Sequence, residues 1–269
     1  ERVAGESEDP PIARESLLSR GSVRRRMLWL MSHEHTDSPH QQPMHGFGAD
    51  RAAHYDAQAS IALAGAAALY ELGVSALTAQ LDGQDAASLL FVGVGTGAEL
   101  LPYTRFDVPG WRFTGVDPSE AMLAVARQRL ETEGLLARTQ LHVGELHTLP
   151  EGQPFDGAQM MGVLHHVEGQ EARCGLLREV ARRLKPGAPL VVGCRVGMDP
   201  VLVDVELRRQ RALGAPREDI ERRRPLYAQM KPVESDAALA AMLAIGFFTE
   251  PWLYLTETAS QTMAARFHR

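Results

Sequence analysis

LLFVGVGTGAELL, residues 89–101, is the stretch of this sequence that decides the fold. Its first four residues are apolar and run directly into Gly93, Gly95 and Gly97, which is typical of a buried strand that ends in a tight turn. Glycine has no Cβ atom, so a ligand can approach the backbone of such a turn closely. A helix that begins near Ala98 would point its free N–H groups at that ligand. The stretch therefore predicts a strand, a nucleotide-type loop and a helix.

The motif around these glycines narrows the class of ligand. No Lys-Ser or Lys-Thr follows the loop, so it is not a phosphate loop of the GxxxxGK[ST] kind. It also lacks the GxGxxG spacing of dinucleotide-binding folds. Both differences favour a ligand without a pyrophosphate. Taken alone, the glycines leave a plain corner between a strand and a helix open as the alternative.

Composition indicates a folded enzyme-sized domain and disfavours two classes of partner. The chain has 269 residues, 45% of them hydrophobic and 23% charged, which is enough for one sizeable core. A net charge of −6 gives no basic field for nucleic acid, and no apolar run approaches the ~20 residues of a membrane span. The two cysteines, Cys174 and Cys194, suggest no disulfide framework. We therefore expect a cytoplasmic protein with a small-molecule substrate, and leave open whether it forms a homodimer.

Residues 1–46 differ from the rest of the chain. They are polar, charged and without periodicity, and we expect them to form a disordered tail before a domain that spans residues 47–269. Four histidines in the tail, His33, His35, His40 and His45, leave metal binding open as an alternative, although nothing rigid would hold them in place.

Strands and helices alternate through the domain, which predicts a doubly wound, Rossmann-like α/β sheet. The strands are expected at 89–92, 111–116, 139–143, 155–161 and 190–196, followed by a closing pair at 247–255 and 258–267. This makes seven strands, mostly parallel, with an antiparallel last strand. Residues 50–81 predict N-terminal helices that Gly73 interrupts. Residues 199–232 predict a helical insertion or lid after the fifth strand, whose Arg-rich part reads as a solvated helix or, alternatively, as a binder of carboxylates or phosphates.

Four chemically distinctive residues stand at the ends of successive strands: Gly93, Asp117, Glu145 and His165. Ligands of such sheets bind at the carboxyl ends of the strands. Asp117 follows Gly97 by 20 residues, a spacing at which a carboxylate meets ribose hydroxyls in nucleotide-binding folds. The alternative is that Asp117 caps the next helix, with Pro118 at its first position. The linked spacing favours the ligand role.

These motifs, taken in order, resemble the class I S-adenosylmethionine-dependent methyltransferases. FVGVGTGAE, GVDPSEAMLAVARQRL, GELHTLP and LLREVARRLKPGAPLVV are similar to that family's successive motifs, and the resemblance covers roughly Tyr55 to Arg269. It implies S-adenosylmethionine as the cofactor, with Asp117 at the ribose and Glu145 at the adenine. The cofactor-binding residues that it implies are Gly93, Val94, Gly95, Thr96, Gly97, Glu99, Asp117, Pro118, Met122, Gly144, Glu145, Leu146, Met161 and Gly162. Phe91 departs from the family, which usually has an acid there, and Glu99 is a candidate to replace that carboxylate.

The insertion and tail also resemble, more distantly, the carboxy-S-adenosylmethionine synthase group of tRNA wobble-uridine modification. Arg224 matches the arginine that holds the extra carboxylate in that group. Met161 stands where that group has an asparagine, and Ala66 offers no counterpart to its tyrosine. The resemblance is therefore one of architecture more than of reaction.

The expected activity is methyl transfer to a small molecule, as in specialised metabolism. Methyl transfer from a sulfonium depends mainly on alignment, and a base is needed for a hydroxyl or an acidic C–H. His165, His166 and Tyr55 are the candidate catalytic residues, and Tyr55, His165, Arg224 and Tyr227 are candidates to bind the substrate. Histidine spacings match no metal-ligand pattern, so no metal is expected. The alternatives are the carboxy-S-adenosylmethionine synthase reaction and a non-enzymatic binding protein on the same fold.

Overall fold

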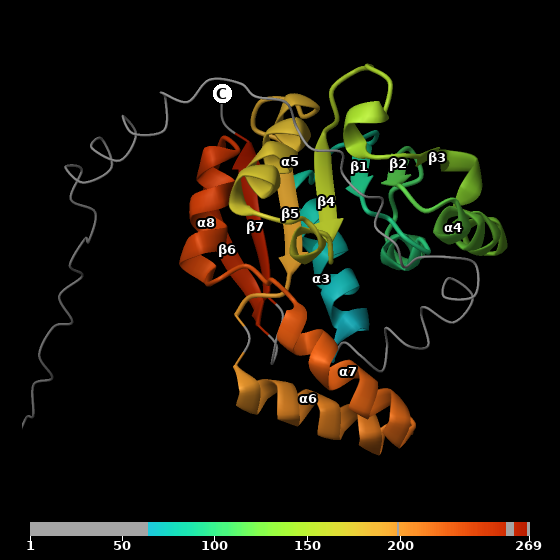
Figure 1. The fold of residues 1–269 in the computed structure, drawn as a ribbon. Coiled ribbons are helices and arrows are strands. Elements are labelled where there is room, and N and C mark those ends of the chain that lie inside the picture. Colours follow the sequence, from blue (N-terminus) through green and yellow to red (C-terminus); the bar gives the residue numbers. More distant parts are fainter. Residues whose placement is uncertain (1–63, 198, 257–260, 268–269) are drawn as a thin grey trace, which may run out of the picture. The chain divides into compact units, whose positions relative to one another are not determined.

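The computed structural model describes residues 64–197, 199–256 and 261–267. Seven strands form one sheet in the order β3-β2-β1-β4-β5-β7-β6 (Figure 1). The strands are β1 (Ser88–Val92), β2 (Arg112–Asp117), β3 (Thr139–Val143), β4 (Gly157–Met161), β5 (Pro189–Cys194), β6 (Phe248–Thr256) and β7 (Gln261–Phe267). Strands β1 to β5 pair in parallel, and β7 is antiparallel to both β5 and β6. The prediction of an α/β fold around a parallel sheet is confirmed.

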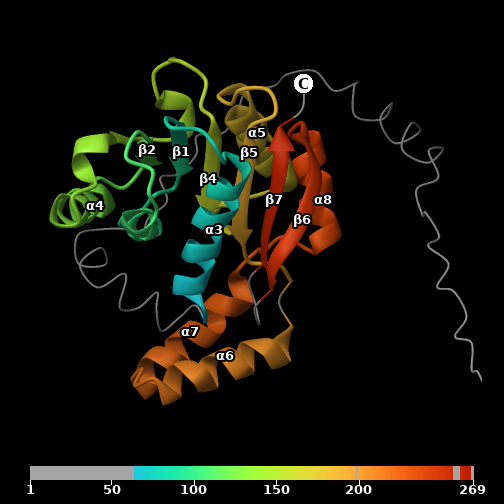
Figure 2. The ribbon, with the colours of Figure 1, turned by 180° about the vertical axis from the view of Figure 1, so that it is seen from behind.

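Helices cover both faces of this sheet, as expected for a largely parallel sheet whose central strands, β1, β4 and β5, are buried. The helices are α3 (Ala66–Gln80), α4 (Glu120–Thr132), α5 (Gln170–Arg182), α6 (Pro200–Ala212), α7 (Arg217–Gln229) and α8 (Asp236–Ile245), with 3-10 turns η1 (Ala98–Arg105), η2 (Leu136–Arg138), η3 (Leu146–Thr148) and η4 (Leu164–His166). Helices α3 and α4 pack on one face with η1, and α5 and α8 pack on the other (Figures 1 and 2). Helices α6 and α7 lie beyond the carboxyl ends of β4 and β5.

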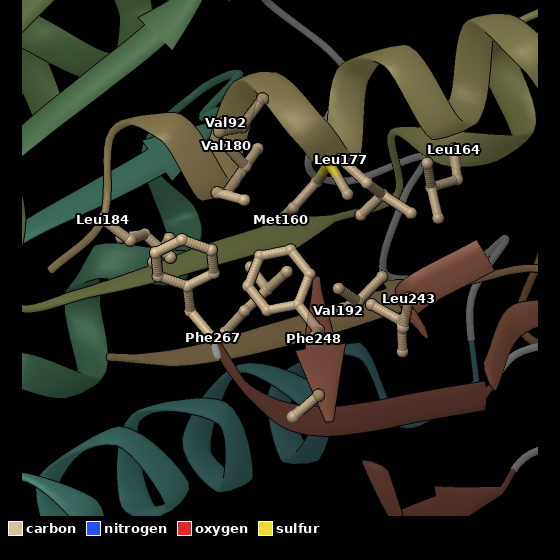
Figure 3. Packing of buried hydrophobic residues seen from close by; sticks show 14 of the residues in the cluster. Val92, Met160, Leu164, Leu177, Val180, Leu184, Val192, Leu243, Phe248 and Phe267 are labelled. Atoms are coloured by element: carbon tan, nitrogen blue, oxygen red, sulfur yellow. The ribbon is translucent and has the colours of Figure 1, made fainter. Parts of the chain in front are cut away.

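The core has two layers because side chains of a strand alternate between its faces. On the α5 side, Val92, Met160 and Val192 from β1, β4 and β5 meet Leu177 and Phe248 (Figure 3). On the α3 side, Phe91 packs edge-on against Tyr103 and Phe113, with ring centroids 6.0 and 5.9 Å apart. Phe91 therefore fills the position behind the glycine turn with apolar surface.

Two expectations about helices are wrong. Gly73 does not interrupt the first helix, because α3 runs through it unbroken. A Cβ at Gly73 would lie 2.8 Å from Met161 Cε and 2.9 Å from Gln159 Oε1, so the glycine lets the helix approach β4 closely. The Arg-rich segment is two helices and not one, because Gly214, with φ +94°, and Pro216 turn the chain between α6 and α7.

Other predictions fall outside the described residues. These are the tail with its histidines, and His54 and Tyr55. None of the helices in the described ranges is long and apolar enough to cross a membrane.

Candidate functional site

Side chains hold the glycine turn after β1, in which Gly93 and Gly95 are partly exposed and Gly97 is buried. Gly93 has φ +70°, and a Cβ there would collide with Val163 Cγ2 from the loop after β4. Val94 is buried, and Arg129 of α4 donates from Nη1 to the carbonyl and hydroxyl oxygens of Thr96 at 2.8 and 2.9 Å. Val94 and Thr96 therefore anchor the turn, while Gly93 and Gly95 provide the accessible backbone.

Asp117, at the end of β2, joins three strand ends. Its Oδ2 accepts a hydrogen bond from Gly95 N at 2.9 Å, and its Oδ1 accepts one from Ser119 N at 2.8 Å. Its main-chain carbonyl accepts from Gly144 N at 3.0 Å, after β3. Burial raises the pKa of this carboxyl, and the two backbone donors oppose that shift. The helix cap itself is Ser119, whose hydroxyl accepts from Met122 N at 3.2 Å, so Asp117 is not the cap of α4.

The loop after β3 places Glu145 at the surface and Leu146 in the core. Glu145 is exposed, with Oε2 3.3 Å from His147 Nδ1. Gly144, with φ +147°, packs against Thr148, whose hydroxyl bonds to His142 Nε2 at 2.8 Å. The carboxylate that the resemblance assigns to adenine therefore lies at the edge of the site, free to turn toward a ligand.

The loop after β4 holds the two candidate catalytic histidines. Gly162 N donates to Gly193 O at 2.7 Å, which ties this loop to β5. The His165 and His166 rings lie 4.2 Å apart between centroids. His165 Nδ1 is buried with no hydrogen-bond partner among the described residues. Burial, and then the charges of His166, Arg195 and Arg173, lower the pKa of His165 well below its usual value, so its ring is neutral at pH 7. His166 is exposed.

Glu99 and Gln159 form a buried polar pair beside the glycine turn. Gln159 Nε2 donates to Glu99 Oε2 at 2.8 Å, and Glu99 Oε1 has no partner within the described residues. Burial raises the pKa of Glu99 to about 8, the Gln159 hydrogen bond lowers it in part, and the charge of Asp117 raises it further. A buried carboxyl with one open oxygen favours a cationic or donating ligand group, because such a group would satisfy it.

These residues fit a nucleoside cofactor with an amino-acid tail. The partly exposed backbone of Gly93 and Gly95 would face such a ligand, and the Asp117 carboxylate retains lone pairs for hydroxyl donors. Glu99 Oε1, buried and without a partner among the described residues, would accept from an ammonium group. Met122 Cε would lie 3.6 Å from a Cβ on Gly95, so its side chain borders the same turn. Pro118 is exposed, whereas Met161 is largely buried on the α3 side of β4.

The lid residues separate into a surface arginine and a buried tyrosine. Arg224 is exposed and bonds from Nη1 to Asp204 Oδ1 at 2.5 Å. Tyr227 is buried and lies under the guanidinium of Arg195, whose Cζ is 5.2 Å from the ring centroid. The structure therefore brings Tyr227 toward the end of β5 and does not bring Arg224 there.

Sequence reasoning missed three polar residues of this region: Gln159, Arg195 and Arg173. A signal existed for two of them, since Gln159 and Arg195 interrupt the apolar runs of β4 and of the segment after β5. Polar residues inside an apolar strand indicate a local partner or a ligand. Arg173 lies on α5, where an arginine is unremarkable, and only its burial distinguishes it. In the described part of the chain, no three His, Cys, Asp or Glu side chains gather so as to hold a metal ion.

Comparison with known families identifies this arrangement. Residues 89–187, from β1 to the turn before β5, match the family described as a methyltransferase domain. The chain contains a methyltransferase domain. The matched segment of the methyltransferase domain includes the glycine turn, Asp117, Glu145 and both candidate histidines. Its parallel α/β sheet is the fold that the motifs predict.

Two curated proteins resemble the methyltransferase domain in sequence. A 37.1 kDa uncharacterized protein in transposon TN4556 of Streptomyces fradiae is 35% identical over 114 residues, which are 42% of this chain and 31% of that protein. A release factor glutamine methyltransferase of Gloeobacter violaceus is 27% identical over 148 residues, which are 46% of this chain and 51% of that protein. The chain thus spans between about a third and a half of the length of these relatives.

A solved structure extends the likeness beyond the matched segment. Magnesium protoporphyrin IX methyltransferase from Synechocystis PCC 6803, solved with bound S-adenosylmethionine, has a TM-score of 0.53 and 16% sequence identity to this chain. The likeness covers 81% of this chain and 94% of that one. At this identity the likeness establishes the fold.

Proposed function

We propose that this protein transfers a methyl group from S-adenosylmethionine to a small-molecule acceptor. The observation that carries the proposal is the position of Asp117, which hydrogen-bonds the glycine turn after β1 and the loop after β3. Its carboxylate binds the turn expected at the methionine part of the cofactor, and its main-chain carbonyl binds the loop expected at the adenine. The methyltransferase-domain match over the same residues supports it.

The chain's own residues supply binding and alignment. Bound S-adenosylmethionine supplies a methyl group on a positively charged sulfur, and its transfer needs orientation of the acceptor more than acid–base chemistry. In this proposal the glycine turn and Glu99 hold the amino-acid part, Asp117 the ribose and Glu145 the adenine. The loop from Gly162 to His165 faces the acceptor, because it follows β4 at the centre of the sheet.

His165 is the candidate proton acceptor. Its ring is neutral, so it is free to take a proton from an acceptor hydroxyl. Its lowered pKa makes it a weak base while the site is empty of negative charge, and an anionic acceptor beside it would raise that pKa. The acceptor's chemistry therefore bears on whether His165 works as a base.

A small-molecule acceptor is supported by the charge of the chain and by the lid. The net charge of −6 opposes nucleic-acid binding. Helices α6 and α7 lie beyond the ends of β4 and β5, where they would cover a small acceptor (Figure 1). We also propose a cytoplasmic location, which the free, buried thiols of Cys174 and Cys194 support.

Titration calorimetry with S-adenosylmethionine tests the proposal directly. We expect saturable binding to the wild-type protein and loss of affinity in Asp117→Ala, with unchanged folding by circular dichroism. Absence of binding to wild type would overturn the proposal. Mass spectrometry of the ligand that co-purifies distinguishes the carboxy-S-adenosylmethionine synthase reaction, because that cofactor carries the additional mass of a carboxylate.

A further inference from the structure

Arg195 is a buried cation without an acidic partner. It directly follows β5, and its residue is 9% exposed. Among the described residues its guanidinium makes no hydrogen bond or ion pair. Its one polar contact there is a cation–π interaction with the ring of Tyr227. Buried charges in folded proteins are normally paired, because desolvation of an isolated charge is costly. The described residues therefore offer the Arg195 guanidinium no anionic partner.

The Tyr227 ring is held in place from the lid side. Its hydroxyl accepts a hydrogen bond from Gln210 Nε2 at 3.0 Å, and Gln210 Oε1 accepts one from Arg223 Nη1 at 2.7 Å. The nearby acid, Glu206, is bound to Gln210 and to Arg209 at 3.1 and 3.2 Å. Glu206 is thus paired with residues of the lid and does not neutralise Arg195.

A second buried guanidinium adds positive charge to the same place. Arg173, 7% exposed, donates to the carbonyl oxygens of Val167, Pro232 and Lys231, so its hydrogen bonds are made without neutralising its charge. Arg173 and Arg195 both act on His165, whose Nδ1 is buried and unpartnered within the described residues. Two cations and an open ring nitrogen therefore surround the loop that follows β4.

We propose that Arg195 binds a carboxylate of the methyl acceptor, with His165 Nδ1 as its neighbour. The proposal rests on the proposed function and names the class of its substrate, a small carboxylic acid. A planar guanidinium matches the two oxygens of a carboxylate, and stacking on Tyr227 uses its face and leaves its N–H edge for them. The lid then closes one side of the acceptor site through Tyr227.

The test uses benzoate as the probe, with benzamide and phenyl phosphate as matched comparisons. Titration of the full chain, with and without S-adenosylhomocysteine, is followed by the 15N shift of Arg195 Nε and by calorimetry. We expect benzoate to shift the Arg195 resonance and to bind about 10- to 100-fold more tightly than benzamide, as a charge-assisted hydrogen bond does. Arg195→Met should lose this preference, and Arg195→Lys should retain part of it. Arg217→Met, which removes an exposed α7 arginine paired with Glu221, is the matched control and should bind as wild type does.

Each contrary result has a definite meaning. Absence of benzoate binding to wild type, or equal binding to Arg195→Met, overturns the proposal. Tighter binding of phenyl phosphate than of benzoate replaces the carboxylate by a phosphate. If Arg195→Met loses affinity for S-adenosylhomocysteine instead, Arg195 holds the cofactor and the proposal is wrong. Failure of wild type to bind any adenosyl ligand, with benzoate binding intact, overturns only the proposed methyl transfer. Arg195→Lys, folded by circular dichroism, keeps the test decisive if Arg195→Met does not fold.

Discussion

Gln159 and Glu99, 60 residues apart in the chain, share a hydrogen bond of 2.8 Å in the buried layer between α3 and the sheet. The pair places a carboxyl with one unpartnered oxygen, as judged from the described residues, beside the glycine turn. Phe91 occupies the place where related domains carry an acid, and its ring packs in the aromatic cluster with Tyr103 and Phe113. We therefore propose that Glu99, on the neighbouring element η1, takes the place of that acid.

The first prediction concerns pH and stability. The pKa of Glu99 is raised from 4.5 to about 8, so its contribution to stability is present below pH 4.5 and is lost as the pH rises through 8. The free energy of unfolding of wild type should therefore fall by about 4 kcal/mol from this group between pH 5 and 9. Glu99→Gln keeps the acceptor for Gln159 and lacks the titration. Urea unfolding at both pH values measures the difference, and parallel pH profiles for the two proteins would contradict it.

The second prediction concerns cofactor affinity. If Glu99 Oε1 accepts from the ammonium of the cofactor, Glu99→Ala should weaken S-adenosylmethionine binding at least about tenfold, and more than Asp117→Asn does. Asn at 117 keeps one carbonyl acceptor for the ribose or for a backbone donor. Calorimetry on both variants, with Glu99→Gln as the isosteric control, decides the point. An unchanged Kd for Glu99→Ala would refute the replacement of the missing acid by Glu99.

Two helical glycines should respond in opposite directions to alanine. Gly73→Ala brings a Cβ within 3 Å of Met161 Cε and Gln159 Oε1 and should destabilise the protein by about 1–3 kcal/mol. Gly175→Ala, on α5, meets no atom within 4 Å and should stabilise it by about 0.5–1 kcal/mol. Chemical denaturation measures both. Equal effects would show that helix propensity, and not the approach of α3 to β4, governs Gly73.

Arg173 should stabilise the join between α5 and the segment before α8. Arg173→Lys cannot bind three carbonyl oxygens in the same fork geometry and should lower the free energy of unfolding by about 2–3 kcal/mol. Arg178→Lys, exposed on the same helix, provides the control and should change it by less than about 0.5 kcal/mol. Indistinguishable midpoints for the two variants would exclude this role.

Several expectations from the sequence stay predictions. The cofactor-binding roles assigned from the sequence, from Gly93 to Gly162, stay predictions, and so do the catalytic roles of His165 and His166. Tyr55 lies outside the described residues. Arg224 pairs with Asp204 at the surface, which gives no support to a grip on an extra carboxylate.

The sequence by itself determined the parallel α/β sheet, the glycine turn after β1 and the acid at the end of β2. These features depend on residues adjacent in the chain: an apolar run makes a buried strand, and glycines allow the left-handed backbone that follows it. Because parallel strands align their carboxyl ends, the order of motifs also predicted which residues would share one edge.

Only the tertiary structure decided the pairing of Glu99 with Gln159, the continuity of α3 through Gly73 and the stacking of Arg195 on Tyr227. Each joins residues that are far apart in the chain: Glu99 and Gln159 are 60 residues apart, Arg195 and Tyr227 are 32 apart, and Gly73 and Gln159 are 86 apart. Such contacts depend on how closely helices approach strands and on which polar side chains become buried away from water. Local propensity predicts neither of these, so the buried polar groups of the site can be found only from the packing.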